Sequence, residues 1–321
     1  MKKIPVIAVV GATASGKTAM AVNLAKLFNG EVISADSMQI YKEMNIATAK
    51  PDKSEQDGIP HHLIDFLETD EKYSVARFVE DAKRCAKDIY SRGKIPVVAG
   101  GTGLYVDSFL ENVLFDDEPD NTVVREKLLE RRQKEGIDSL FEELKKIDPE
   151  TASSLHINNE GRIIRALEIY YLTGQTKSER LVLSRRAQSA FSPVYIGLDY
   201  KDREKLYSRI DLRVDIMLQN GLLEEAKEYF SIEKNCTAAQ AIGYKELAPF
   251  FNGEITLEEA VDNLKRATRR YAKRQLTWFR KNKKINWIYC DEYEDYQDIL
   301  NRASCIIRKH LDGKVSDNGE E

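Results

Sequence analysis

Hydrophobic and polar positions follow two alternating patterns along the first 110 residues. Short apolar runs at 4–10, 31–36 and 95–101 are rich in β-branched residues and predict buried strands. The stretches 17–28 and 75–91 carry apolar residues at helical spacing and predict helices. Alternation of buried strands with helices is typical of a parallel sheet. We therefore expect an α/β core whose first part covers residues 1–115.

The pattern changes in the middle of the chain. From 116 to 192 the β-branched runs vanish, and charged helical segments at 123–136 and 161–174 predict a mostly helical insertion domain. Strand character returns at 193–200 and again at 285–290. Residues 193–312 are thus expected to rejoin the core and to add basic C-terminal helices. The polar segment 313–321 is expected to form a frayed tail.

A glycine-rich loop, "GATASGKT", follows the first predicted strand and precedes the first predicted helix. Its spacing predicts a backbone cradle for phosphate, in which a lysine adds charge and a hydroxyl can reach Mg²⁺. The position between a strand and a helix favours this interpretation over a chance match. We expect a P-loop NTPase-like sheet, with phosphate or diphosphate bound by Gly11, Ala12, Thr13, Ala14, Ser15, Gly16, Lys17 and Thr18.

Two further strands end in loops with candidate chemistry. Asp36 follows the second strand, where its carboxylate could accept a proton or hold Mg²⁺ through water, or could merely cap the next turn. Thr102 lies in "AGGTGLY" after the third strand, in a loop that suits close approach to a ligand but also suits a plain tight turn. Ligands bind at the carboxyl ends of parallel strands, so the three loops together predict a pocket.

The charge of the chain is unevenly distributed. The formal net charge is −4, yet 265–284 holds ten Lys or Arg residues and no acid. In a helix, Leu264, Ala267, Tyr271 and Trp278 fall on one side, while the cations gather opposite: Arg266, Arg269, Arg270, Lys273, Arg280 and Lys284. This face could bind nucleic-acid phosphates, or could be solvated and paired within the chain. Tyr271, Trp278 and Phe279 are expected to belong to the core rather than to stack on bases.

Other features limit the class of protein. No apolar run approaches the length of a membrane span, and the N-terminus lacks a small-residue cleavage site, so we expect an uncleaved cytoplasmic protein. The four cysteines are far apart and are expected to be reduced thiols. His61 and His62, with Asp65 nearby, are expected to be structural rather than metal ligands, because no further His or Cys lies at ligand spacing. Arg162 and Arg165 share a helical face that is either solvated or a phosphate clamp.

Seven segments, in this order, resemble the tRNA dimethylallyltransferase family: "GATASGKT", "ISADSMQIYKEMNIATAKP", "IPHHLID", "GGTGLY", "GRIIRALEIY", "QAIGYKEL" and "RRYAKRQLTWFR". That family transfers a dimethylallyl group from dimethylallyl diphosphate to an adenine beside the tRNA anticodon. The resemblance implies that the glycine-rich loop grips the diphosphate, that Lys17, Thr18 and Thr102 are catalytic, and that Asp36 is the general base.

The resemblance also implies contacts with tRNA. Thr102 would help to hold the target nucleotide, and Asp36, Ser37, Met38 and Gln39 would form a tRNA-contacting segment. Arg125, Arg162 and Arg165 resemble arginines that face the donor or the RNA, and the cationic face around Arg269 and Lys273 would bind the RNA backbone. Mg²⁺ would be held through Thr18. We expect a monomer that acts on the anticodon loop of tRNA and does not associate with a membrane.

Two other functions remain compatible with the residues taken alone. An ATP-dependent small-molecule kinase would use the same loop and an Asp after the second strand, but it would leave the basic helix unexplained. A non-catalytic RNA-binding protein could retain the glycine-rich loop without using it for catalysis. Consumption of ATP would distinguish the first from a prenyltransferase, and absence of turnover would distinguish the second.

Overall fold

The computed structural model describes residues 3–111, 122–186, 189–231 and 241–316. These residues fall into two compact units. The first unit combines residues 1–110 with 190–321, and the second comprises residues 111–189.

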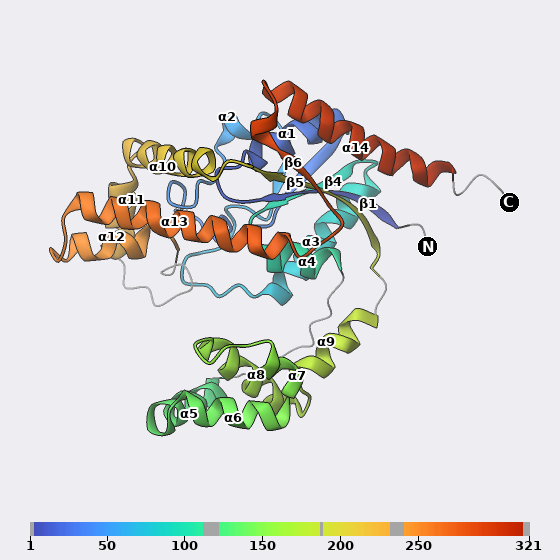
Figure 1. Cartoon of the computed structure of the whole chain (residues 1–321). Helices are drawn as coiled ribbons and strands as arrows, with labels where there is room; N and C mark the ends of the chain where they lie inside the picture. The colour runs from blue at the N-terminus through green and yellow to red at the C-terminus, as the bar shows by residue number, and fades with distance from the viewer. Residues whose placement is uncertain (1–2, 112–121, 187–188, 232–240, 317–321) are drawn as a thin grey trace. The chain divides into compact units, whose positions relative to one another are not determined.

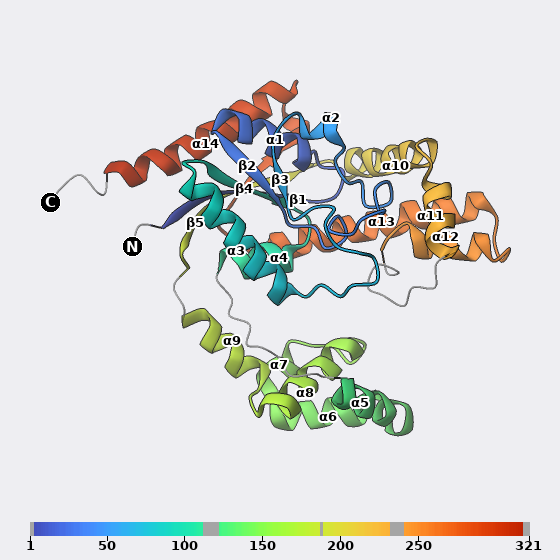
Figure 2. The ribbon, with the colours of Figure 1, turned by 180° about the vertical axis from the view of Figure 1, so that it is seen from behind.

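Within the described residues, the first unit is built on a six-stranded sheet in the order β3-β2-β4-β1-β5-β6, and every neighbouring pair is parallel (Figures 1 and 2). The strands are β1 (Ile4–Gly11), β2 (Gly30–Ser34), β3 (His61–His62), β4 (Ile95–Gly100), β5 (Phe191–Asp199) and β6 (Ile285–Tyr289). Both β1 and β5 are buried over most of their length, as expected for strands covered on both faces.

Helices cover both faces of this sheet (Figures 1 and 2). On one face lie α1 (Lys17–Leu27) and α14 (Tyr296–Ser316), whose residues Leu24 and Ile307 are buried with Val9 and Ile196 of the strands. On the other lie α3 (Val75–Ser91), α4 (Gly103–Leu110) and α13 (Leu257–Phe279). The remaining elements are α2 (Lys53–Gln56), α10 (Arg203–Gln219), α11 (Leu222–Ser231), α12 (Tyr244–Phe251) and the short 3₁₀ helix η2 (Cys290–Glu292).

The second unit is helical over its described residues. Its helices are α5 (Thr122–Glu135), α6 (Ile137–Ile147), α7 (Pro149–Ser153), α8 (Glu160–Thr173) and α9 (Lys177–Arg186). They bury an aliphatic core that includes Leu128, Leu140, Leu144 and Leu167. Asp148 caps α7 by accepting the N–H of Thr151 at 3.0 Å, and Pro149 suits the first helical position because it needs no hydrogen-bond acceptor there.

The predicted strands and the helices expected at 17–28 and 75–91 are present, with boundaries shifted by no more than two residues. The basic helix expected at 265–284 is displaced: α13 begins at Leu257 and ends at Phe279, so Arg280 is its C-cap residue and Lys284 lies beyond it. Strand β3 was not predicted, because two residues are too short for a pattern. Its histidines are structural, as expected: His61 Nδ1 lies 2.9 Å from the Ile59 carbonyl oxygen, and His62 Nε2 lies 2.8 Å from buried Glu31.

The expected tail at 313–321 is partly wrong. Helix α14 continues to Ser316, and 317–321 lie outside the described residues, as does the expected domain boundary at 116. Strand β5 begins at Phe191, two residues before the expected return to the core. In the described ranges no helix is long and apolar enough to cross a membrane.

Candidate active site

Three neighbouring strands end at the same edge of the sheet, and each is followed by one of the loops singled out in the sequence. Val10 of β1 is in register with Gly100 of β4, and Ala99 of β4 is in register with Ser34 of β2. The three strands are parallel, so the phosphate loop, the Thr102 loop and the Asp36 loop lie side by side.

The phosphate loop offers a set of unused hydrogen-bond donors. Gly16 has φ +93°, a left-handed conformation that glycine adopts readily, and it is the N-cap residue immediately before α1. Counting described residues only, the backbone N–H groups of Ala14, Gly16, Lys17 and Thr18 donate to no protein group. Over the same residues, the buried Ser15 Oγ has no partner either. Donors gathered at a helix N-terminus form an anion site, so the loop fits phosphate.

Lys17 completes this cradle. Its Nζ donates to the carbonyl oxygen of Ala12 at 2.5 Å, which holds the side chain back along the loop. The pKa of Lys17 is lowered to about 7: burial is the main cause, the positive charge of Arg213 adds to it, and the negative charge of Asp36 opposes both. These effects destabilise the protonated form of Lys17. A bound anion would stabilise it, because the negative charge offsets the loss of hydration and the repulsion from Arg213.

Arg213, which the sequence analysis missed, belongs to the same cluster. It lies on α10, one turn after Arg209, whose Nε donates to the carbonyl oxygen of Ala14 at 3.0 Å. Burial lowers the pKa of Arg213, while the charge of Asp36 raises it. The signal available in the sequence was the spacing of two arginines four residues apart, which places both on one face of a helix.

Only one of the two carboxylate oxygens of Asp36 accepts hydrogen bonds from the described chain. Its Oδ1 accepts the backbone N–H groups of Met38 at 2.9 Å and Gln39 at 3.4 Å. Oδ2 has no hydrogen bond to the part of the chain that the structure describes. The two alternatives for Asp36 are therefore compatible: one oxygen caps the turn, and the other is available to a substrate.

Thr102 connects its own loop, after β4, with the Asp36 loop, after β2. Its Oγ1 accepts the N–H of Ser37 at 3.2 Å and lies 3.4 Å from Ser37 Oγ. Its own N–H donates to the carbonyl oxygen of Ala35 at 3.3 Å. Thr102 is thus fixed beside the turn that carries Asp36, with the phosphate loop on the neighbouring strand.

A family model described as IPP transferase matches residues 39–282, and one described as isopentenyl transferase matches residues 4–67. The chain belongs to the IPP transferase family. A tRNA dimethylallyltransferase from a Thermoanaerobacter species is 46% identical over 316 residues, which cover 98% of this chain and 99% of that protein. One from Bacillus anthracis is 42% identical over 316 residues, 98% of each chain.

Solved structures from this family agree. The full-length tRNA isopentenylpyrophosphate transferase from Bacillus halodurans is 42% identical, with a TM-score of 0.71 over 98% of this chain and 99% of that one. A eukaryotic dimethylallyltransferase acting on tRNA is 32% identical, with a TM-score of 0.80 over 97% of this chain and 80% of that one. The P-loop NTPase-like fold and the assignment to a transferase family that modifies tRNA are confirmed.

The segment 36–39 of this IPP transferase is only partly available to RNA. The amide of Gln39 accepts a hydrogen bond from Ser34 Oγ at 3.2 Å and donates to the carbonyl oxygens of Thr48 at 3.2 Å and Ala49 at 3.0 Å. Gln39 therefore holds the turn to the loop at 45–49. All four residues of the segment are half-exposed, and Gln39 differs from the others in that its side-chain amide is engaged within the chain.

Some cations of the basic helix α13 form ion pairs within the chain, and others are exposed. Both carboxylate oxygens of Asp211 on α10 accept from Arg269 Nη1, at 2.7 and 2.6 Å, and Lys265 pairs with Asp215 at 2.6 Å. Lys273 is exposed and pairs with no carboxylate among the described residues. On the apolar side, Phe279 is buried as expected.

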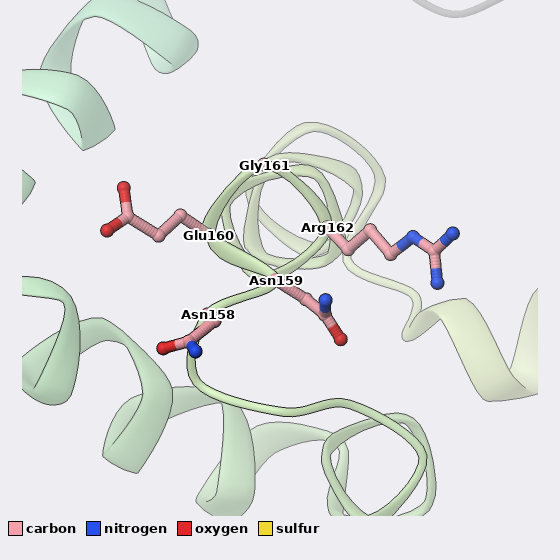
Figure 3. Close-up of a pocket in the computed structure, with 5 residues that line it drawn as sticks. All are labelled: Asn158, Asn159, Glu160, Gly161 and Arg162. Carbon is pink, nitrogen blue, oxygen red and sulfur yellow. The ribbon is translucent and has the colours of Figure 1, made fainter. Parts of the chain in front are cut away.

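The three arginines assigned to RNA in the helical unit fall into two kinds. Arg125 and Arg165 both bind Glu168, which is fully buried, so they neutralise a charge inside the unit. Arg162 is exposed and, within the described ranges, has no carboxylate partner. It lines a hollow of about 430 Å³ with residues 158–161 at the start of α8, pointing away from Glu160 (Figure 3).

Proposed function

We propose that this member of the IPP transferase family transfers a dimethylallyl group from dimethylallyl diphosphate to the exocyclic amine of the adenine next to the anticodon in tRNA, and releases diphosphate. The observation that carries the proposal is the meeting of the free donors of the phosphate loop with Asp36 and Thr102 at one edge of the sheet.

The phosphate loop acts on the leaving group. As the bond between the allylic carbon and oxygen breaks, negative charge develops on the diphosphate. The free N–H groups of the loop, with Lys17 and Arg213, would stabilise that charge directly. The buried Ser15 hydroxyl, which has no partner within the described residues, would gain an acceptor from the donor substrate.

Mg²⁺ is part of the proposal. Among the described residues there is no group of three His, Cys, Asp or Glu side chains that could hold a metal. This donor set fits an ion bound mainly by phosphate oxygens and waters, with the Thr18 hydroxyl as the protein ligand. When bound, Mg²⁺ supplies further positive charge to the leaving diphosphate.

Asp36 is proposed as the general base. The exocyclic amine of adenine is a poor nucleophile, because its lone pair is delocalised into the ring. Removal of a proton by Asp36 Oδ2 as the new bond to carbon forms would offset that weakness. Thr102, fixed by Ser37 at the same turn, would help to hold the nucleotide.

The target adenine must leave its stack to reach this edge of the sheet, which costs a few kcal/mol and least in a loop. The anticodon loop meets that requirement. The exposed cations of α13, such as Lys273, and Arg162 of the helical unit would contact RNA phosphates. The donor and base residues all lie in one unit, so we propose that a monomer suffices, acting in the cytoplasm on tRNA.

One experiment tests reaction, donor and acceptor together. The protein is incubated with unmodified tRNA, Mg²⁺ and either dimethylallyl diphosphate or ATP, and the nucleosides are analysed by mass spectrometry. We expect prenylated adenosine with the allylic donor alone, formed about 10² times more slowly, or slower still, by the Asp36→Asn variant. ATP consumption without prenylation would support the kinase alternative instead.

A further inference from the structure

A buried side-chain amide connects the phosphate loop with the Thr102 loop. Gln275 of α13 is 5% exposed. Its Oε1 accepts the backbone N–H of Thr13 at 2.8 Å, and its Nε2 donates to the carbonyl oxygen of Gly101 at 3.1 Å. One side chain therefore touches the loop proposed to hold the donor and the loop proposed to hold the target nucleotide.

The packing around this amide leaves it little freedom. A Cβ on Gly101 would lie 2.0 Å from Nε2 of Gln275, so a side chain at that position would collide with the amide. Tyr271, one turn earlier on α13, adjoins the same point. Burial and the charge of Asp36 raise the pKa of Tyr271, and hydrogen bonds with Thr102 and Gln275 oppose the rise.

We propose that Gln275 is a positioning residue that fixes the separation and orientation of the phosphate loop relative to the Thr102 loop. The bridge needs an acceptor at one end and a donor at the other, which only an amide or a protonated carboxyl of this length supplies. The inference rests on the proposed prenyl transfer, because the benefit is alignment of the allylic carbon with the amine. A misplacement of about 1 Å can cost about 10² in rate.

Substitutions at Gln275 separate alignment from simple stability. Gln275→Met keeps the volume and removes both hydrogen bonds. Gln275→Glu keeps the acceptor for Thr13 but, when ionised, turns a negative oxygen towards the carbonyl of Gly101. When protonated, it can donate to that carbonyl as the glutamine does. Burial and the facing carbonyl raise the pKa of such a glutamate, so its protonated fraction grows as the pH falls towards about 6.

The measurement is the single-turnover rate constant for tRNA prenylation at saturating enzyme and donor, because this constant does not depend on the folded fraction. We expect Gln275→Met to lower it about 10-fold to 100-fold at every pH, with donor and tRNA affinities changed by less than about threefold. For Gln275→Glu, we expect the rate relative to wild type to rise at least about fivefold between about pH 8 and about pH 6. Saturating donor should keep Lys17 protonated over this range, because a bound diphosphate raises its pKa above the value of about 7 in the free protein.

Gln297→Glu is the matched control. Gln297 is exposed on α14 and its Nε2 donates to Asn301 at 3.2 Å, so its rate relative to wild type should stay near one at every pH. A Gln275→Glu ratio that does not change with pH, or a Gln275→Met rate equal to wild type, would overturn the positioning role. Wild-type protein that makes no prenylated adenosine would instead overturn the proposed function itself. If Gln275→Met does not fold, the Gln275→Glu pH comparison on one folded protein decides.

Discussion

Asp36 Oδ1 accepts the backbone N–H of Met38 at 2.9 Å, and this bond assigns the two oxygens of the carboxylate to different tasks. The first oxygen holds the turn that follows β2. The second has no hydrogen bond to any residue that the structure describes, and it lies on the edge of the sheet shared with the phosphate loop. A substitution that keeps the first oxygen and neutralises the second can therefore separate structure from catalysis.

Asp36→Asn is that substitution. Its amide oxygen can still accept from Met38, so the turn and the melting temperature should change little. Turnover should fall by about 10² or more, within the usual range for loss of a general base, with donor affinity nearly unchanged. Steady-state prenylation and thermal unfolding measure the two effects. Asp36→Ala, which loses both oxygens, should also lower the melting temperature, and turnover retained by Asp36→Asn would remove the assignment.

Lys17 should make donor binding dependent on pH. Its pKa of about 7 is held down by burial and by Arg213, and a bound diphosphate should raise it. At about pH 8 the donor is already ionised, so binding should take up about one proton, which goes to Lys17. Affinity should therefore weaken as the pH rises above about 7. Calorimetry in two buffers of different ionisation enthalpy measures the uptake. Lys17→Met should show none, and uptake that persists in this variant would contradict the prediction.

Arg213 should act on both the donor and Lys17. In Arg213→Met, donor affinity below about pH 7 should fall about 10-fold to 100-fold, as for loss of a charged hydrogen bond. The pKa of Lys17 should rise, because the positive charge of Arg213 lowers it. The midpoint of proton uptake should therefore move to higher pH. Arg302→Met, on the exposed surface of α14, is the matched control and should change neither quantity.

The positions of Lys17, Asp36 and Thr102 could be predicted because local rules fix them. The spacing of the phosphate loop requires a strand before it and a helix after it, and parallel strands place their carboxyl ends at one edge. The prediction therefore needed no contact between distant segments. The structural role expected for His61 and His62 agrees with their hydrogen bonds to Ile59 and Glu31, although the sequence could not name these partners.

The residues that the sequence analysis missed lie on helices that reach the site only in the folded chain. Arg213 and Gln275 follow the helical insertion, about 200 residues or more after the phosphate loop that they contact or influence. A signal for Gln275 existed, since a polar residue sat within the apolar arc of α13 beside Leu276. Periodicity could mark it as buried, but could not show that its partners are Thr13 and Gly101.

The helical periodicity placed Arg269 and Lys273 on the same cationic face, but the two residues have different surroundings in the structure. Both fall on the cationic arc, but Arg269 faces α10, where Asp211 takes its charge, whereas Lys273 is exposed. An amphipathic pattern distinguishes polar from apolar faces. It does not reveal which polar residues meet a carboxylate on another helix.

This separation gives opposite expectations for two alanine substitutions on one helix. Lys273→Ala should lower the slope of log affinity for tRNA against log salt by about one, because one phosphate contact is lost, and should leave the melting temperature unchanged. Arg269→Ala should leave the slope unchanged and lower the melting temperature slightly, because it removes a half-exposed ion pair with Asp211. Filter binding at several salt concentrations and thermal unfolding measure both.

Asp211→Asn is the control for the pair: it should lower the melting temperature like Arg269→Ala, while freeing Arg269 to increase the slope. Equal slopes for wild type and Lys273→Ala would retire the RNA contact for Lys273, and a reduced slope in Arg269→Ala would show that Asp211 does not keep Arg269 from the RNA.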